Sequence, residues 1–253
     1  MAVRAGCQGL ELRTLAGTPV TPDLSAAERR RIQELCAEAG IEICVVGSDC
    51  KLANPNQMAR RAEIARAAGF VDLADGWGAA VVRVFGGRFE QSPPEPAVDD
   101  LLAAALREVA QQADEYGIQI ALETHDAFSS GVRVGRILEK AAHPGAAALW
   151  DLGHPFRAGE PVQQTWDAIG AYVAHVHFKD VRRVPGMQDW EPVLAGRGDL
   201  PLDDMIGRLA QGDYYGYVSV EWERRVDPVA DDPAAALPQH TQVIRELLAR
   251  HGG

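Results

Sequence analysis

The chain has 253 residues, of which 47% are hydrophobic and 24% charged, an ordinary globular composition with enough material for the core of one α/β barrel. Its formal net charge of -11 argues against a polyanionic partner, so we expect no nucleic acid to bind. The four cysteines lack C-x-x-C spacing, and neither a signal-like apolar start nor a membrane-spanning segment is evident, so we expect a reduced, cytoplasmic protein that does not bind membranes.

Short apolar or β-branched segments alternate with longer stretches of helical periodicity along the whole chain. The predicted strands are 9–13, 41–48, 80–86, 118–125, 147–154, 173–180 and 216–223. Between them, the segment 25–40 has Ser25 as a helix-start signal and Gly40 as a stop, and 96–117 stops at Gly117 in the same way. This alternation predicts repeated βα units around a parallel sheet.

The predicted fold is a TIM-type (β/α) barrel formed by residues 1–253 as a single domain, with seven recognisable strands instead of eight. Residues 1–6 resemble the end of a helix that leads into the first strand, so the first βα unit is missing. Either the start lies upstream, or the barrel is open between its first and last strands, with two unpaired edges. A doubly wound open sheet is the competing fold, but no glycine-rich phosphate-binding turn follows the first strand.

Metal-binding residue types gather at the carboxyl ends of the last four predicted strands, where barrel active sites lie. They are Glu123, Asp151, His177 and Glu221. Any one of them alone is more typical of a solvated charge at a strand end, but four in register favour a metal site. Three carboxylates and one imidazole suit Mn²⁺ or Mg²⁺ best, with Co²⁺ or Zn²⁺ as alternatives.

Strand alternation adds candidates for substrate binding, because residues two apart share a face. His125 shares a face with Glu123, and Lys179 shares one with His177. A lysine beside carboxylates stays charged and can polarise a substrate carbonyl, although a buried structural role is the alternative. His154 lies three residues after Asp151, at the end of the fifth predicted strand, and is either a substrate contact or a loop histidine in water.

Four sequence blocks together resemble the xylose-isomerase-like superfamily of barrels. They are ALETHDAF, ALWDLGHPFRAGE, HVHFKDVRR, and GRGDLPLDDMIGRL followed by GYVSVEWE. The superfamily contains sugar and sugar-phosphate isomerases and epimerases, inosose dehydratases, hydroxypyruvate isomerases and endonuclease IV. The resemblance to its ketose 3-epimerases implies that Glu123 and Glu221 are metal-bound acid/base groups, with Asp151 and His177 completing the coordination.

The same resemblance implies roles for the neighbouring positions. His154 and Arg183 match residues that contact substrate oxygens in those epimerases, and Lys179 with Asp180 matches a common H-x-K-D variant. The implied activity is that of a metal-dependent isomerase or epimerase, which takes a small sugar, sugar phosphate or related hydroxy-ketone and removes its α-proton. A homo-oligomer is compatible with the sequence.

Three other functions fit parts of this pattern. An inosose-type dehydratase would use the same metal and the same proton abstraction, and the blocks do not separate it from an isomerase. A degenerate barrel that binds without catalysis is compatible with the missing βα unit. DNA repair of the endonuclease IV kind is disfavoured, because Arg83 stands where an extra metal-binding histidine is expected and no D-x-H follows HVHFKDVRR.

Overall fold

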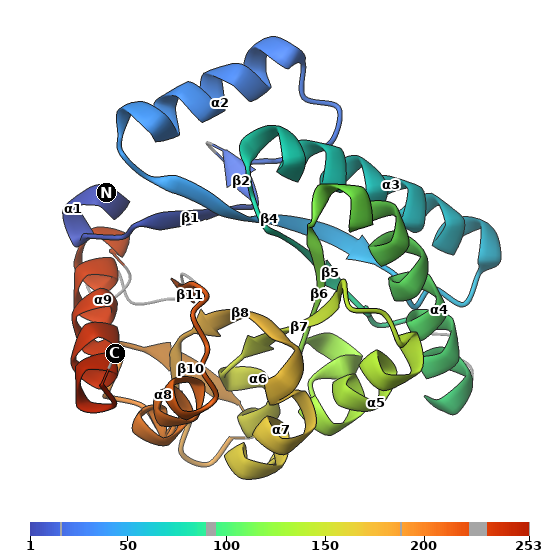
Figure 1. Cartoon of the computed structure of the whole chain (residues 1–253). Helices are drawn as coiled ribbons and strands as arrows, with labels where there is room; N and C mark the ends of the chain where they lie inside the picture. Colours follow the sequence, from blue (N-terminus) through green and yellow to red (C-terminus); the bar gives the residue numbers. More distant parts are fainter. Residues whose placement is uncertain (16, 90–94, 188, 223–231, 253) are drawn as a thin grey trace.

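A computed structural model describes residues 1–15, 17–89, 95–187, 189–222 and 232–252. Seven parallel strands form one sheet that curves into a nearly closed barrel with helices around it, which confirms the predicted barrel (Figure 1). In spatial order the strands are β1 (Gly9–Leu12), β4 (Glu42–Lys51), β5 (Val81–Phe85), β6 (Gln119–Glu123), β7 (Ala146–Asp151), β8 (Val173–Phe178) and β11 (Val218–Val220).

The edges of this sheet are β1 and β11, as the sequence predicts. The predicted last strand is shorter than expected, and its final position, 223, lies outside the described residues. Two hydrogen bonds cross the opening between these edges without joining β1 to β11 directly. Tyr217 donates a hydrogen bond to the Glu42 carboxylate at 2.6 Å, and Thr241 of α9 (Pro233–Arg250) donates one to the carbonyl of Ala5 in α1 (Ala2–Ala5).

The helices begin and end at local signals in the sequence. Ser25 caps α2 (Ala26–Glu38) in a capping box with Glu28, which explains the start predicted there. The helix predicted over 96–117 is α4 (Glu95–Ala113), which a 3₁₀ turn extends to the left-handed Gly117. The other helices are α3 (Gln57–Trp77), α5 (Gly131–Ala141), α6 (Gly153–Arg157), α7 (Val162–Ile169) and α8 (Leu202–Gln211).

The buried apolar residues form two separate clusters. The larger one packs the sheet against the surrounding helices. The smaller one consists of Cys44, Val45, Val81, Ala121, Ala147 and Leu149. Glu123 and Asp151 lie two residues beyond Ala121 and Leu149 on the same strand faces, so the strands turn from apolar to charged toward their carboxyl ends.

A hairpin that the sequence reading did not anticipate follows β8. It pairs β9 (Asp180–Arg183) with β10 (Trp190–Val193) in antiparallel register. A smaller hairpin joins β2 (Thr14–Leu15) to β3 (Thr18–Pro19). Among the described residues, no helix combines the length and apolar character that crossing a bilayer requires.

Candidate metal centre

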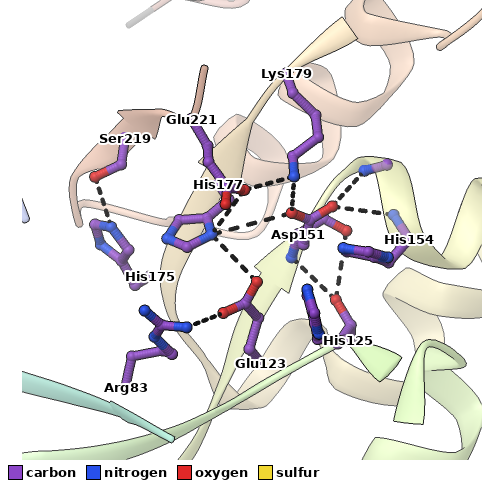
Figure 2. A network of polar contacts seen from close by, with 12 residues as sticks. Arg83, Glu123, His125, Asp151, His154, His175, His177, Lys179, Ser219 and Glu221 are labelled. Atoms are coloured by element: carbon purple, nitrogen blue, oxygen red, sulfur yellow. Dashed lines mark hydrogen bonds and ion pairs between the residues drawn. The ribbon is translucent and has the colours of Figure 1, made fainter. Parts of the chain in front are cut away.

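Four predicted side chains meet at the carboxyl end of the barrel (Figure 2). Glu123, Asp151, His177 and Glu221 each present one possible ligand atom, and these atoms lie within 4.8 Å of one another. His177 Nδ1 lies 3.4 Å from Glu123 Oε1, 4.0 Å from Asp151 Oδ2 and 3.3 Å from Glu221 Oε2. The structure therefore brings together the four side chains predicted from the sequence as metal ligands.

Strand register explains why these residues meet. Glu123 and Asp151 are the last residues of β6 and β7, and Glu221 follows β11 directly. In the ladders His177 of β8 lies opposite both Asp151 and Ser219. Because neighbouring parallel strands end at the same rim, one residue from each brings four ligand atoms to one point.

The buried polar atoms of the cluster fit a cation. Asp151 Oδ2, His177 Nδ1 and Glu221 Oε2 are buried without a hydrogen-bond partner of good geometry. Asp151 Oδ1 accepts from the backbone N–H groups of Gly153 and His154 at 2.8 and 3.0 Å, which leaves Oδ2 directed at the cluster. Lys179 Nζ contacts both carboxylate oxygens, and apart from it the three atoms face one another. Together they make a donor set suited to a divalent ion.

Positive charge already concentrates at this point. Lys179 Nζ lies 2.7 Å from Asp151 Oδ2 and 2.5 Å from Glu221 Oε2. Burial alone would lower the pKa of Lys179, but these two carboxylates hold it above its ordinary value. Burial would likewise lower the pKa of His177, but Glu11 and Glu123 hold it well above the usual range. The carboxylates therefore stabilise positive charge at this point, either on a protonated side chain or on a metal ion.

The carboxylic acids of the cluster respond differently to the same surroundings. Burial raises the pKa of Asp151 to about 6 against the opposing charge of Lys179. Burial also acts to raise the pKa of Glu221, but His177 and Lys179 hold it well below its ordinary value. Glu221 is thus the more readily ionised of the two.

The predicted substrate-binding residues do not all reach the cluster. His154 and Lys179 line a cavity together with Glu221, and its lining also includes Trp190 of the hairpin and Trp222. Burial and the charge of Lys179 lower the pKa of His154 to about 3, so its imidazole is neutral. Its ring packs edge-on against His125, with ring centroids 4.4 Å apart.

His125 and Arg183 do not line that cavity, but a ring nitrogen of His125 lies within 4.8 Å of possible ligand atoms of Glu123 and His154. His125 Nδ1 is 3.2 Å from Asp126 Oδ1, and its ring packs against Phe85. Arg183 is exposed at the end of β9 and is not among the residues that line the cavity. The hairpin accounts for this position, because β9 carries the chain away from the rim six residues after His177.

Two residues that the sequence reading did not assign to the site also contact it. Glu11 of β1 places Oε2 2.7 Å from His177 Nε2. Arg83 of β5 donates to Glu123 Oε2 at 3.1 Å. Charged residues inside the apolar strands GLEL and VVRVF were the available signal, since an ion in a buried strand needs a partner.

A parallel barrel with ligating groups at its carboxyl rim defines an α/β-barrel protein with a candidate catalytic metal centre. A family model described as xylose isomerase-like TIM barrel matches residues 1–247. The chain belongs to that family.

Curated relatives of this chain are enzymes of several kinds. A putative hydroxypyruvate isomerase of Streptomyces coelicolor is 32% identical over 163 residues, which are 60% of this chain and 55% of the relative. A fructoselysine 3-epimerase of Shigella flexneri is 24% identical over 183 residues, 70% and 64% of the two chains. An inosose dehydratase of Lacticaseibacillus casei is 27% identical over 154 residues, 54% and 49%. The matches thus span about half to two thirds of the curated relatives' length.

Solved structures support the fold. A crystal structure of IolI protein with a bound zinc atom superposes with a TM-score of 0.83 at 17% identity, covering 99% of this chain and 91% of the other. A D-tagatose 3-epimerase-like protein gives a TM-score of 0.72 at 22% identity, covering 90% and 84%. At these identities the likeness concerns the fold of the chain.

Proposed function

We propose that this protein is a metal-dependent isomerase or epimerase of a small sugar, sugar phosphate or related hydroxy-ketone, and that it removes the proton next to the substrate carbonyl. The observation that carries the proposal is the cluster of Glu123, Asp151, His177 and Glu221, in which four possible ligand atoms from neighbouring strand ends lie within 4.8 Å of one another. Three carboxylates favour Mn²⁺ or Mg²⁺, with Co²⁺ or Zn²⁺ as alternatives.

The proposed chemistry needs both the ion and the protein's own acids and bases. A divalent ion held by these four residues would stabilise the negative charge that develops on the substrate oxygens. Glu123 and Glu221 would remove and return the proton. They come from β6 and from the segment after β11, with β7 and β8 between them, so they approach the centre from different sides. Inversion at a carbon requires bases on its two faces.

Neighbouring side chains would hold the substrate. Lys179, already between two carboxylates, would place its charge beside a substrate oxygen. His154 is neutral and lines the cavity, so it can donate or accept a hydrogen bond to a hydroxyl group. Trp190 and Trp222 give the same cavity an apolar wall on which the carbon face of a sugar can pack.

A dehydratase is the second candidate, because relatives of comparable similarity include inosose dehydratases. It would begin with the same proton abstraction and continue with loss of hydroxide from the next carbon. The substrate and the fate of that hydroxide separate the two activities.

The test is turnover in deuterated water with Mn²⁺ over a panel of ketoses, ketose phosphates and inososes, with products analysed by NMR. Deuterium at the carbon next to the carbonyl is the expected result, because a carboxylate that takes up the proton exchanges it with solvent. Product without solvent label would indicate a hydride shift and remove the glutamates from the base role. Loss of water from an inosose would establish the dehydratase, and no turnover with metal bound would favour the degenerate barrel.

A further inference from the structure

A carboxylate on the edge strand β1 contacts the metal-ligand candidate His177. Glu11 lies on β1, at one edge of the sheet, while β8 lies next to the other edge. Its Oε2 is 2.7 Å from His177 Nε2 and 3.5 Å from His175 Nε2. The Glu11 side chain is 13% exposed and that of His177 is 5% exposed, so water competes little for this contact.

This contact determines which ring nitrogen of His177 has a lone pair available for a metal ion. A neutral imidazole has one N–H and one lone-pair nitrogen, and an ionised carboxylate only accepts hydrogen bonds. In the neutral imidazole that would bind a metal ion, the nitrogen beside Glu11 therefore carries the hydrogen, which leaves the lone pair on Nδ1. Nδ1 is the atom that faces the carboxylates of Glu123, Asp151 and Glu221.

The surroundings hold Glu11 in this position. Arg83 Nη2 lies 3.8 Å from Glu11 Oε1, so the carboxylate sits between a cation and the imidazole. Gly47 of β4 leaves room for both, because an added Cβ there would lie 2.9 Å from each of those two atoms. Ser219 pairs with His175 Nε2 at 2.8 Å, so that second imidazole already has a partner.

We propose that Glu11 is a positioning residue for the metal centre: it fixes the His177 tautomer, with the hydrogen on Nε2 and the lone pair on Nδ1 directed at the ion. The inference rests on the proposed metal site. Partners of this kind raise ligand basicity and hold ring orientation, and their loss typically weakens metal affinity about 10–100-fold.

The test compares Zn²⁺ affinity and the histidine NMR signals of the zinc-loaded protein in three variants. Glu11→Met removes the acceptor and should weaken Zn²⁺ binding about 10–100-fold, with loss of the slowly exchanging His177 Nε2–H signal. Glu11→Gln keeps a carbonyl oxygen for that hydrogen, so its signal should persist and its affinity loss should be smaller. Glu42→Gln removes a carboxylate that bonds Tyr217 outside the cluster, and it should bind Zn²⁺ like the parent protein.

Different results would contradict the metal site and the role of Glu11. A parent protein that binds no Zn²⁺ at the cluster would overturn the metal site itself. A parent protein that binds Zn²⁺ while Glu11→Met matches it within twofold, with the Nε2–H signal unchanged, would overturn the role of Glu11 alone. If Glu11→Met does not fold, Glu11→Gln decides: absence of its Nε2–H signal, with zinc bound, would contradict the assignment of the tautomer.

Discussion

Replacing Lys179 with methionine removes an ammonium group that contacts both Asp151 and Glu221. Its side chain is 10% exposed and that of Asp151 is fully buried. Breaking a buried pair by removing one partner costs about 3–5 kcal/mol, because the remaining charge stays buried. For a domain of this size, a loss of about 3 kcal/mol corresponds to a fall of roughly 6–12 °C in the melting temperature of the metal-free protein.

Metal should reverse most of that loss. A bound divalent ion neutralises the same carboxylates, so saturating Mn²⁺ should raise the melting temperature of Lys179→Met more than that of the parent protein. Turnover should still fall about a hundredfold or more, because the charge that we propose beside the substrate oxygen is gone. Differential scanning calorimetry with and without Mn²⁺, together with steady-state kinetics, measures both effects.

Lys140→Met is the matched control. Lys140 pairs with Asp100 at 2.6 Å, but both side chains are about half exposed or more, so its loss should cost less than about 1 kcal/mol. Equal destabilisation by the two variants, or loss of Mn²⁺ binding in Lys179→Met, would refute the reasoning.

Three further predictions concern the acids and the ion. Glu123→Gln and Glu221→Gln should each keep the fold by circular dichroism while turnover falls at least about a hundredfold, and near-normal turnover in either would exclude that residue as a base. Chelation should abolish turnover and lower the melting temperature, with recovery on adding Mn²⁺ or Mg²⁺, and full activity after verified metal removal would contradict a metal mechanism. Asp180→Ala should lower the free energy of unfolding, measured by urea denaturation, by about 2–4 kcal/mol, because the carboxylate accepts hydrogen bonds from the backbone N–H groups of Val181, Gly196 and Gly198. A change below about 1 kcal/mol would contradict that structural role.

The parts of the fold and site that follow from local patterns were predictable. Short apolar segments and helix-stop glycines are local signals, because they lie within or next to the strands and helices that they define. The seven strands and the two sheet edges were therefore predictable from the sequence. The proximity of Asp151 and His177 was predictable because parallel strands end at one rim of the barrel. In the structure the strand register places the two residues opposite each other.

The remaining contacts depend on curvature and on an unanticipated turn. Glu11 and His177 are 166 residues apart, and only the closing of the barrel brings β1 across to β8. The VPG turn forms a hairpin, with Gly186 in the left-handed region, and Arg183 is exposed on it, so its contact with the substrate stays a prediction. Pro185 and Gly186 between two β-prone segments were the signal for that hairpin.

Anomalous diffraction from crystals grown with Mn²⁺ tests the central claim most directly. We predict one strong manganese peak per chain, bounded by Glu123, Asp151, His177 and Glu221, with ligand distances of about 2.0–2.4 Å and His177 bound through Nδ1. Manganese bound only elsewhere, or a cluster whose four side chains are dispersed while manganese is present, would contradict the account.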